Sequence, residues 1–504
     1  MVPASRTPIT HRAFQAAVRN AALVLCALLS PALALGQTVT TVAASNVGRF
    51  PPGQLAERVT SEADPRQHYA LYVPSSYRPD QRWPILLLMD PRGRALIPMT
   101  RIQEVAERLG YLVMSSYNTR SDEGTDPNAD ALNAMLADAQ RLFSLDVHRL
   151  YLVGQSGTAR AGWIYGYGLR GHVAGLIGIG ASKPDGFLLT RRAPGAFPPL
   201  VFFGAAGTTD YNFDEMWALD TVLDRANLPH RVTYFDGPHA WPPAATLIEA
   251  VEWMELMAMR FGLKPRDARW IDSTLSAAMT RAATLAQAGD EYHAWRRYRA
   301  IVSDFEGLGD VRPAAARLAE LAKSEAVRRT EHHIAETVRA QEGYNERLAT
   351  FLGQYRRSTP EPLERSLQKV QLEALERRAA SSDSIDANAA ERGLEQLWVY
   401  TSFYEPQDYL DRGDPTRALS ILGVAQAMRP NHPDVCFNRA RALARLGQDD
   451  QAVEALECAA RSVISADRIE NDPDLRSLGR EPAFRALVTR LRASPTGSSA
   501  RAGW

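Results

Sequence analysis

The stretch Leu150–Trp163 reads LYLVGQSGTARAGW and decides the fold of the region around it. A strongly apolar run ends at Val153, small residues surround Ser156, and a segment of helical character follows. A strand, a sharp turn and a helix that carry a nucleophilic serine on the turn have this pattern. It departs from GxSxG at the last position, where Thr158 replaces glycine. We expect Ser156 to be a nucleophile if the chain also supplies a base, an acid and an oxyanion hole.

Strands and helices alternate on both sides of this turn, from residue 67 to residue 262. The expected strands are Tyr69–Pro74, Pro84–Asp90, Tyr111–Ser115, Arg149–Val153, Val173–Ile179, Leu200–Gly204 and Arg231–Phe235. Apolar periodicity predicts helices over Ala129–Phe143, Glu215–Arg225 and Ala244–Arg260. This alternation predicts a mostly parallel sheet with helices on both faces.

A catalytic base is expected after the last strand, where the chain offers two histidines. His230 opens that strand, whereas His239 lies in the loop Asp236–Pro243, DGPHAWPP. Because loops carry catalytic side chains on a rigid scaffold, His239 is the predicted base. A surface histidine without a catalytic role is the alternative.

The acid is expected after the preceding strand, LVFFGAAG. Asp210 lies at the carboxyl end of that strand and is the predicted acid. Asp214 is the second candidate, because it falls in or near the next helix. Asp236 is close to the histidine in sequence but follows the wrong strand. The resulting order Ser156, Asp210, His239 is that of the α/β-hydrolase triad.

An oxyanion hole needs two donors that point at one position. The backbone N–H of Gly157, directly after the nucleophile, is the first expected donor. The second is expected from the loop after PILLLMD, from the N–H of Arg92 or Gly93, since Pro91 has none. Solvated charges are the alternative role for Arg92 and Arg94.

Two other groups of polar residues are candidate sites. Asn118 and Arg120 follow the strand YLVMSS and either contact substrate or, as we favour, brace a loop. The adjacent His332 and His333 lie among glutamates, but their order is not HExxH and neighbouring residues point to different helix faces. We therefore expect a solvated helix face there, with no metal and no cofactor.

The second half of the chain is predicted to be all helical. Residues 263–395 are rich in Ala, Arg, Glu and Leu, and residues 396–493 contain a repeat. The pairs Gly413/Gly447, Ala418/Ala452 and Ala425/Ala459 are each separated by 34 residues. This spacing is typical of tetratricopeptide repeats, with a weaker copy near Gly289. A generic helical hairpin is the alternative, and residues 494–504 are expected to be disordered.

The N-terminal residues 1–36 have the features of a signal peptide, with basic residues before the apolar segment Ala21–Leu35. Cleavage is expected near Ala34 or Gly36, and an uncleaved anchor is the alternative. Residues 37–66 are expected to be a lead-in segment. This pattern predicts a periplasmic or secreted protein that has no stable membrane span after cleavage.

The charge and the cysteine content of the chain limit which partners and crosslinks are expected. Its 504 residues contain 58 Lys plus Arg and 58 Asp plus Glu, so the net charge is zero and nothing indicates nucleic acid binding. Beyond the signal segment only Cys436 and Cys458 remain, which either pair across neighbouring helices or are small buried apolar residues.

Four stretches resemble a known family: LYVPSSYRPDQRWPILLLMDPRGRA, SSYNTRS, YLVGQSGTARAGW and GPHAWPP. They are similar to the α/β-hydrolase superfamily, in particular to secreted esterases of the esterase D, feruloyl esterase and polyhydroxybutyrate depolymerase kind. The resemblance covers about residues 67–262 and implies Ser156 as nucleophile, His239 as base and Asp210 as acid. Thr158 and the loop MDPRGRA, in place of the usual HG-type oxyanion motif, depart from the family pattern.

Together these features predict an exported serine hydrolase that acts on small or polymeric carboxylic esters, with helical repeats that bind a substrate or a protein partner. Two alternatives stay open. The chain is either a non-catalytic binding protein on a hydrolase scaffold, or a peptidase or acyltransferase with the same triad, because these reactions use the same residues.

Overall fold

The computed structural model describes residues 49–121, 127–169, 172–189, 200–461 and 464–493. The chain divides into two compact units, of which the first ends at Glu336 and the second begins at Thr337. The predicted signal peptide and the predicted disordered tail lie outside the described residues. Within the described residues, no helix combines the length and the apolar character that a membrane crossing needs.

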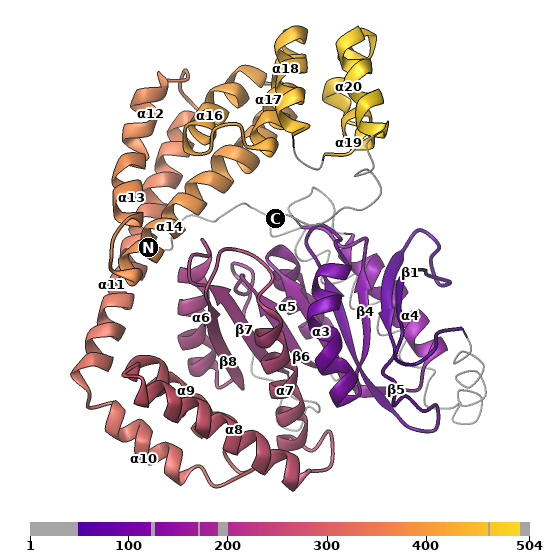
Figure 1. The fold of residues 1–504 in the computed structure, drawn as a ribbon, viewed down its shortest axis with the longest axis vertical. Coiled ribbons are helices and arrows are strands. Elements are labelled where there is room, and N and C mark those ends of the chain that lie inside the picture. The colour runs from indigo at the N-terminus through magenta and orange to yellow at the C-terminus, as the bar shows by residue number, and fades with distance from the viewer. Residues whose placement is uncertain (1–48, 122–126, 170–171, 190–199, 462–463, 494–504) are drawn as a thin grey trace. The chain divides into compact units, whose positions relative to one another are not determined.

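The first unit is built on an eight-stranded sheet with the order β1-β2-β4-β3-β5-β6-β7-β8 (Figure 1). The strands are β1 (Leu55–Thr60), β2 (His68–Tyr72), β3 (Trp83–Met89), β4 (Leu112–Ser116), β5 (Leu145–Gln155), β6 (Val173–Ile179), β7 (Val201–Gly207) and β8 (His230–Phe235). Only β2 runs antiparallel to its neighbours, and the other pairs are parallel. The predicted mostly parallel sheet is therefore confirmed, with β1 as an additional edge strand in the expected lead-in segment.

Helices cover both faces of this sheet, because its strands are apolar on both sides. Along β3, Ile85 and Leu87 belong to one apolar core, and Leu86 and Leu88 belong to the other. The first core is closed by α4 (Asn128–Leu142), α5 (Gly157–Gly168) and α6 (Phe213–Ala226). The second is closed by α3 (Leu96–Leu109) and α7 (Ala244–Arg260), and is extended by α8 (Ala268–Gln287), α9 (Glu291–Asp304) and α10 (Arg312–Leu321) (Figure 1).

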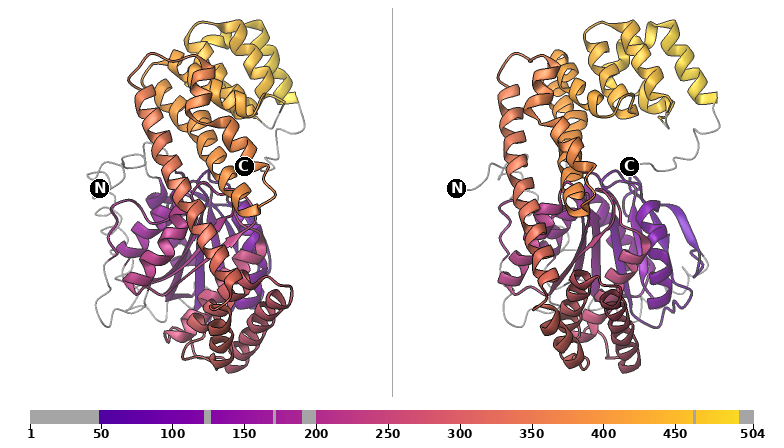
Figure 2. Two further views of the ribbon diagram at one scale, coloured as in Figure 1. Left: turned by 90° about the vertical axis from the view of Figure 1, so that its left-hand side faces the viewer. Right: turned by 60° about the vertical axis from the view of Figure 1, so that its left-hand side comes forward.

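The second unit is helical, as predicted for this part of the chain. The long helix α11 (Glu325–Tyr355) enters it, and its later elements are α12 (Leu363–Lys369), α13 (Leu372–Ala379), α14 (Ser384–Val399), the π-helical turn η2 (Tyr400–Tyr404), α15 (Glu405–Asp411), α16 (Pro415–Met428), α17 (Pro433–Arg445), α18 (Asp449–Ala459), α19 (Ala466–Glu470), η3 (Pro473–Arg480) and α20 (Pro482–Ala493). Neighbouring helices pack side by side as hairpins, in particular α13 with α14, α15 with α16, and α17 with α18 (Figure 2).

The turns of these hairpins explain the repeated glycines. Gly413 and Gly447 adopt φ values of 76° and 69°, and they join α15 to α16 and α17 to α18. Glycine adopts this left-handed conformation without steric cost. Cys436 and Cys458 form a disulfide between α17 and α18, so of the two roles left open by the sequence the structure contains the pairing.

Candidate active site

Ser156 lies on the predicted sharp turn between β5 and α5. Its backbone angles are φ 54° and ψ −130°, a conformation that non-glycine residues rarely adopt, and its N–H donates to the Ile179 carbonyl at 2.8 Å. A Cβ atom on Gly154 would lie 2.7 Å from the backbone of the first turn of α5. A Cβ atom on Gly157 would lie 2.4 Å from Cβ of Ser121. Both glycines are therefore required by close approach, and they hold Ser156 in a strained turn of the kind found at functional sites.

The residue that departs from GxSxG has a defined structural role. Thr158 is fully buried, and its Oγ1 lies 2.7 Å from the carbonyl oxygens of both Met89 and Gln155. The same oxygen accepts the Gln155 N–H at 3.1 Å. The hydroxyl therefore ties the nucleophile turn to the carboxyl end of β3, a contact that glycine cannot make. The sequence marked Thr158 as unusual but did not indicate this partner.

The predicted acid and base lie together. Nδ1 of His239 is 2.8 Å from Oδ1 of Asp210, and the same oxygen accepts the Asn212 N–H at 2.8 Å. Asp210 is fully buried, and the His239 side chain is 15% exposed, so the imidazole keeps access to the surface. Because Nδ1 faces a carboxylate, we assign its proton there, which leaves Nε2 as the ring nitrogen that accepts a proton.

Gly180 connects this pair with the nucleophile turn. It directly follows Ile179, the backbone partner of Ser156. A Cβ atom on Gly180 would lie 2.7 Å from Oδ2 of Asp210 and 3.0 Å from the His239 ring. The pair of Asp210 and His239 is thus packed against Gly180, the residue directly after the one that accepts the Ser156 N–H.

The alternative acids and base lie elsewhere. Asp214 is buried within the first turn of α6, and Asp236 is exposed. His230 begins β8, and its Nε2 lies 3.2 Å from Oδ1 of Asp220. Burial lowers the pKa of His230, but the hydrogen bonds to Asp220 and to a backbone carbonyl outweigh it and leave that pKa raised. The structure brings together only Asp210 and His239 among these candidates.

The loop after β3 does not present its N–H groups as predicted. The Arg92 N–H donates to Oδ1 of Asp90 at 2.8 Å, and the Gly93 N–H donates to the Asp90 carbonyl at 3.1 Å. Because both are used within the loop, this arrangement does not support either of them as a second oxyanion donor. Arg94 is not a solvated charge, since its guanidinium pairs with the fully buried Asp90 carboxylate. Gly157 is the first residue of α5, and the first N–H of a helix has no intrahelical acceptor, so it stays the predicted first donor.

Asp90 also joins this loop to the histidine loop. Nε1 of Trp241, two residues after His239, donates to Oδ2 of Asp90 at 2.8 Å. Arg101 on α3 donates to the Trp241 carbonyl at 2.5 Å. Burial raises the pKa of Asp90, but the hydrogen bonds and charge of Arg94 and the Trp241 bond outweigh it, so that pKa is lowered. The sequence feature that could have indicated this bond between Asp90 and Trp241 is an aspartate directly after a buried strand.

Two side chains that the sequence did not indicate, Tyr211 and Arg160, lie near the predicted site residues. The Tyr211 ring lies against the His239 imidazole, with ring centroids 4.4 Å apart. Arg160, one helical turn after Ser156, pairs with Glu215 of α6 at 2.7 Å. Tyr211 thus gives His239 an aromatic neighbour, and Arg160 places a paired charge on the first turns of α5.

The other predicted polar residues make structural contacts. Oδ1 of Asn118 accepts the His68 N–H at 2.8 Å, and Arg120 donates to two neighbouring backbone carbonyl groups. These are bracing contacts, the role favoured above. His332 is exposed and pairs with Glu336 at 3.1 Å. A ring nitrogen of His333 instead lies within 4.8 Å of carboxylate oxygens of Asp383 and Asp386, a grouping that the sequence did not indicate.

The strand order and the strand-turn-helix at Ser156 assign the first unit. It has an α/β-hydrolase fold. In the second unit, residues 409–461 match the family model of the tetratricopeptide repeat, so the repeat predicted there is confirmed. That match does not include the segment near Gly289.

Comparison with curated proteins found no match. Among solved structures, a ferulic acid esterase is similar at 12% identity and TM-score 0.34, with 40% of this chain and 98% of that chain covered. The Bacillus cereus carboxylesterase has 18% identity and TM-score 0.30, covering 39% and 97%. An S-formylglutathione hydrolase from Agrobacterium tumefaciens has 11% identity and TM-score 0.30, covering 39% and 92%.

Proposed function

We propose that the chain is an exported serine hydrolase that cleaves carboxylic esters through an acyl-enzyme on Ser156. The observation that carries the proposal is the buried Asp210 carboxylate 2.8 Å from Nδ1 of His239, packed on Gly180 next to the backbone partner of the serine. If Asp210 and His239 formed only a structural ion pair, nothing would require Ser156 to adopt its strained φ of 54°. Both features are expected of a nucleophile, a base and an orienting acid.

In the proposed reaction, Nε2 of His239 accepts the hydroxyl proton as Oγ of Ser156 attacks the ester carbonyl. The tetrahedral oxyanion accepts a hydrogen bond from the Gly157 N–H, and Asp210 stabilises the imidazolium that forms. The imidazolium then gives its proton to the leaving alcohol, and the acyl group stays on the serine. Water, activated by the same imidazole, releases the carboxylic acid and restores the hydroxyl.

The test is Ser156→Ala in the full chain, assayed with short p-nitrophenyl esters. We expect turnover to fall by about 10⁶-fold, since single removal of a nucleophile can cost this much. Ser276→Ala, at an exposed serine on α8, is the matched control and should keep full activity. The melting temperature of both variants should equal that of the parent. Equal activity in the Ser156→Ala protein would overturn the proposal.

A fluorophosphonate probe separates the hydrolase from a binding protein on the same scaffold. We expect covalent labelling of Ser156 and none in Ser156→Ala. Correctly folded protein that neither labels nor hydrolyses esters would favour the binding role. A parallel panel of amides and acyl acceptors distinguishes an esterase from a peptidase or an acyltransferase.

Export and partner binding are further parts of the proposal. The basic and apolar N-terminal segment and the disulfide between Cys436 and Cys458 support an oxidising compartment, periplasmic or extracellular. Mass spectrometry of the mature protein should find its N-terminus just after Ala34 or Gly36. We also propose that the repeats bind a protein partner, because stacked helical pairs form concave surfaces.

A further inference from the structure

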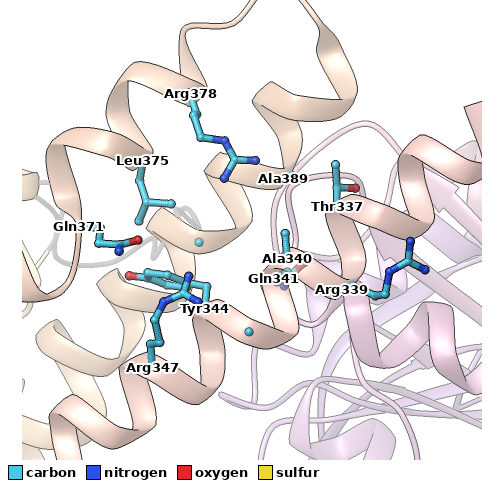
Figure 3. A pocket seen from close by; sticks show the side chains of 12 residues that line it. Thr337, Arg339, Ala340, Gln341, Tyr344, Arg347, Gln371, Leu375, Arg378 and Ala389 are labelled. Atoms are coloured by element: carbon cyan, nitrogen blue, oxygen red, sulfur yellow. The ribbon is translucent and has the colours of Figure 1, made fainter.

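A cavity of about 280 Å³ lies among the helices of the second unit, remote in sequence from the residues of the hydrolase site. Its walls come from α11, from the start and end of α13, and from α14 (Figure 3). All of its lining residues fall between Thr337 and Gly393, before the segment that matches the tetratricopeptide repeat. The cavity is therefore independent of the proposed function.

The lining of the cavity is positively charged. Arg339, Arg347 and Arg378 line it, and no aspartate or glutamate does. Among the residues that the structure describes, neither Arg339 nor Arg347 forms an ion pair, and Arg347 lies over the Tyr344 ring at 5.9 Å (Figure 3). Arg378 is 3.8 Å from Asp386, which is longer than a hydrogen bond. Three exposed guanidinium groups line one cavity, and among the described residues only Arg378 has an acidic group within 4 Å, so they form a site for negative charge.

Two polar residues of the lining, Gln341 and Tyr344, are held in place by hydrogen bonds. Arg392, which is 3% exposed, donates from Nε to Oε1 of Gln341 at 2.7 Å. The Tyr344 hydroxyl donates to the Val370 carbonyl at 3.2 Å. Side chains fixed by buried hydrogen bonds need little ordering when a ligand binds, which favours affinity.

The backbone also shapes the cavity. Gln371, between α12 and α13, has φ 57°, and so takes a left-handed conformation that is uncommon for glutamine. Gly393 lies on the α14 side, where a Cβ atom would come 2.9 Å from the Leu375 side chain and 3.7 Å from the Tyr344 ring. A larger residue at position 393 would therefore press on Leu375 and Tyr344, two residues that line the cavity.

We propose that this cavity binds a small organic anion that carries two or more carboxylate or phosphate groups. Arginine forks bind both kinds of oxyanion with two parallel hydrogen bonds, so the cavity chemistry is common to the two. Its volume of 280 Å³ is close to the lower end of the range for ligand pockets, about 300 Å³, which favours a compact ligand. A multiply charged anion gains from several guanidinium groups at once, whereas a singly charged one does not.

The experiment is calorimetric titration of the full chain at low salt with citrate, pyrophosphate and acetate. We expect citrate or pyrophosphate to bind at least about tenfold more tightly than acetate, because each further charge-assisted bond adds affinity. The double variant Arg347→Gln/Arg378→Gln should weaken that binding by about 100-fold. Arg377→Gln is the matched control, since Arg377 pairs with Glu373 on an exposed helix face and does not line the cavity.

Preference for citrate would identify a carboxylate ligand, and preference for pyrophosphate a phosphate ligand; either outcome supports the site. Absence of heat with all three anions would overturn the proposal. So would binding that is unchanged in the double variant, since the anion would then sit elsewhere. Ester hydrolysis and the melting temperature, measured in the same variants, should be unchanged and report correct folding. If the parent chain hydrolyses no ester, the proposed role of Ser156 fails, but the proposal of an anion site still stands or falls by the titration.

Discussion

The side-chain oxygen of Thr158 lies 2.7 Å from the carbonyl oxygen of Met89, and so links the nucleophile turn to the last residue of β3. The loop that begins after Met89 is the one in which the fold usually supplies an oxyanion donor. Thr158 therefore does more than replace a glycine. It ties the turn that carries Ser156 to the end of β3.

We predict that Thr158→Val lowers ester turnover by about tenfold, because a small displacement of the serine turn is costly when geometry sets the rate. Stability should fall by about 1–2 kcal/mol, since valine leaves the Gln155 N–H without its acceptor and gives up the Met89 contact. Steady-state kinetics and thermal melts measure the two effects. Thr158→Ser should restore both, and Thr284→Val, which removes an exposed helix hydroxyl bond, is the control. Wild-type turnover in Thr158→Val would contradict the assignment.

A second prediction concerns the acid. Asp210→Asn should keep the fold but reduce turnover by about 10³–10⁴-fold, because an amide no longer holds the imidazole in the tautomer that accepts a proton. The Michaelis constant should change little. Asp236→Asn is matched in chemistry and lies in the same loop as His239, but its carboxylate is exposed and does not contact the ring. If Asp236→Asn were the more harmful change, the assignment of the acid would fail.

The third prediction tests the link between the two loops. Trp241→Phe removes the hydrogen bond from Nε1 to Asp90 while it keeps most of the buried aromatic surface. We expect turnover to fall about threefold to tenfold, since the loop that carries His239 loses one of its fixed points. Arg101 still holds the Trp241 backbone, so the melting temperature should fall by only a few degrees. Pre-steady-state acylation rates would show whether the effect lies in the chemical step.

Much of the first unit could be predicted from the sequence because its strands are apolar on both faces and its turns are marked by glycine. All seven expected strands are present, whereas β1 was missed because LAERVT is a polar edge strand with a single buried residue. The sequence also placed Asp210 and His239 correctly at strand ends, which topology brings to one edge of the sheet.

What the sequence could not supply were contacts between segments distant along the chain. The bond from Thr158 to Met89 joins residues 69 positions apart, and the bond from Trp241 to Asp90 joins residues 151 apart. The use of the Arg92 N–H by the Asp90 side chain is local, but it depends on a rotamer that no residue pattern encodes. The arginine-lined cavity depends likewise on how three helices pack.

A fourth prediction follows from the disulfide in the repeats. Cys436→Ser/Cys458→Ser should lower the stability of the second unit by about 3 kcal/mol, as expected for a crosslink that closes a short loop. Ester turnover should be unchanged, because neither cysteine lies near the hydrolase site in sequence. Thermal melts with and without reductant provide the comparison. A parent protein whose melting is insensitive to reductant would show that the crosslink contributes no stability.

The last prediction is a pH dependence of stability at His230. The Asp220 hydrogen bond raises the pKa of His230 despite burial, and the same bond lowers the pKa of Asp220. A raised histidine pKa gives stability that is fully present below its ordinary value of about 6.5 and is lost as pH rises through the folded-state pKa. A lowered aspartate pKa gives stability that is present above about 3.8 and is lost as pH falls through the folded-state value. The pair therefore stabilises the fold most between about pH 4 and pH 6.5.

His230→Gln should accordingly cost about 1–2 kcal/mol near pH 5.5 and less near pH 8.5, because the part of the bond that needs the histidine proton is lost as pH rises through the folded-state pKa. Denaturant unfolding at the two pH values measures the difference. His293→Gln is the control: that histidine also lies 2.8 Å from an aspartate, Asp290, but its side chain is 65% exposed, so solvent screens the pair and little change is expected. An equal loss in His230→Gln at both pH values would mean that the ring acts by packing alone, because a charged hydrogen bond must weaken once the proton is gone.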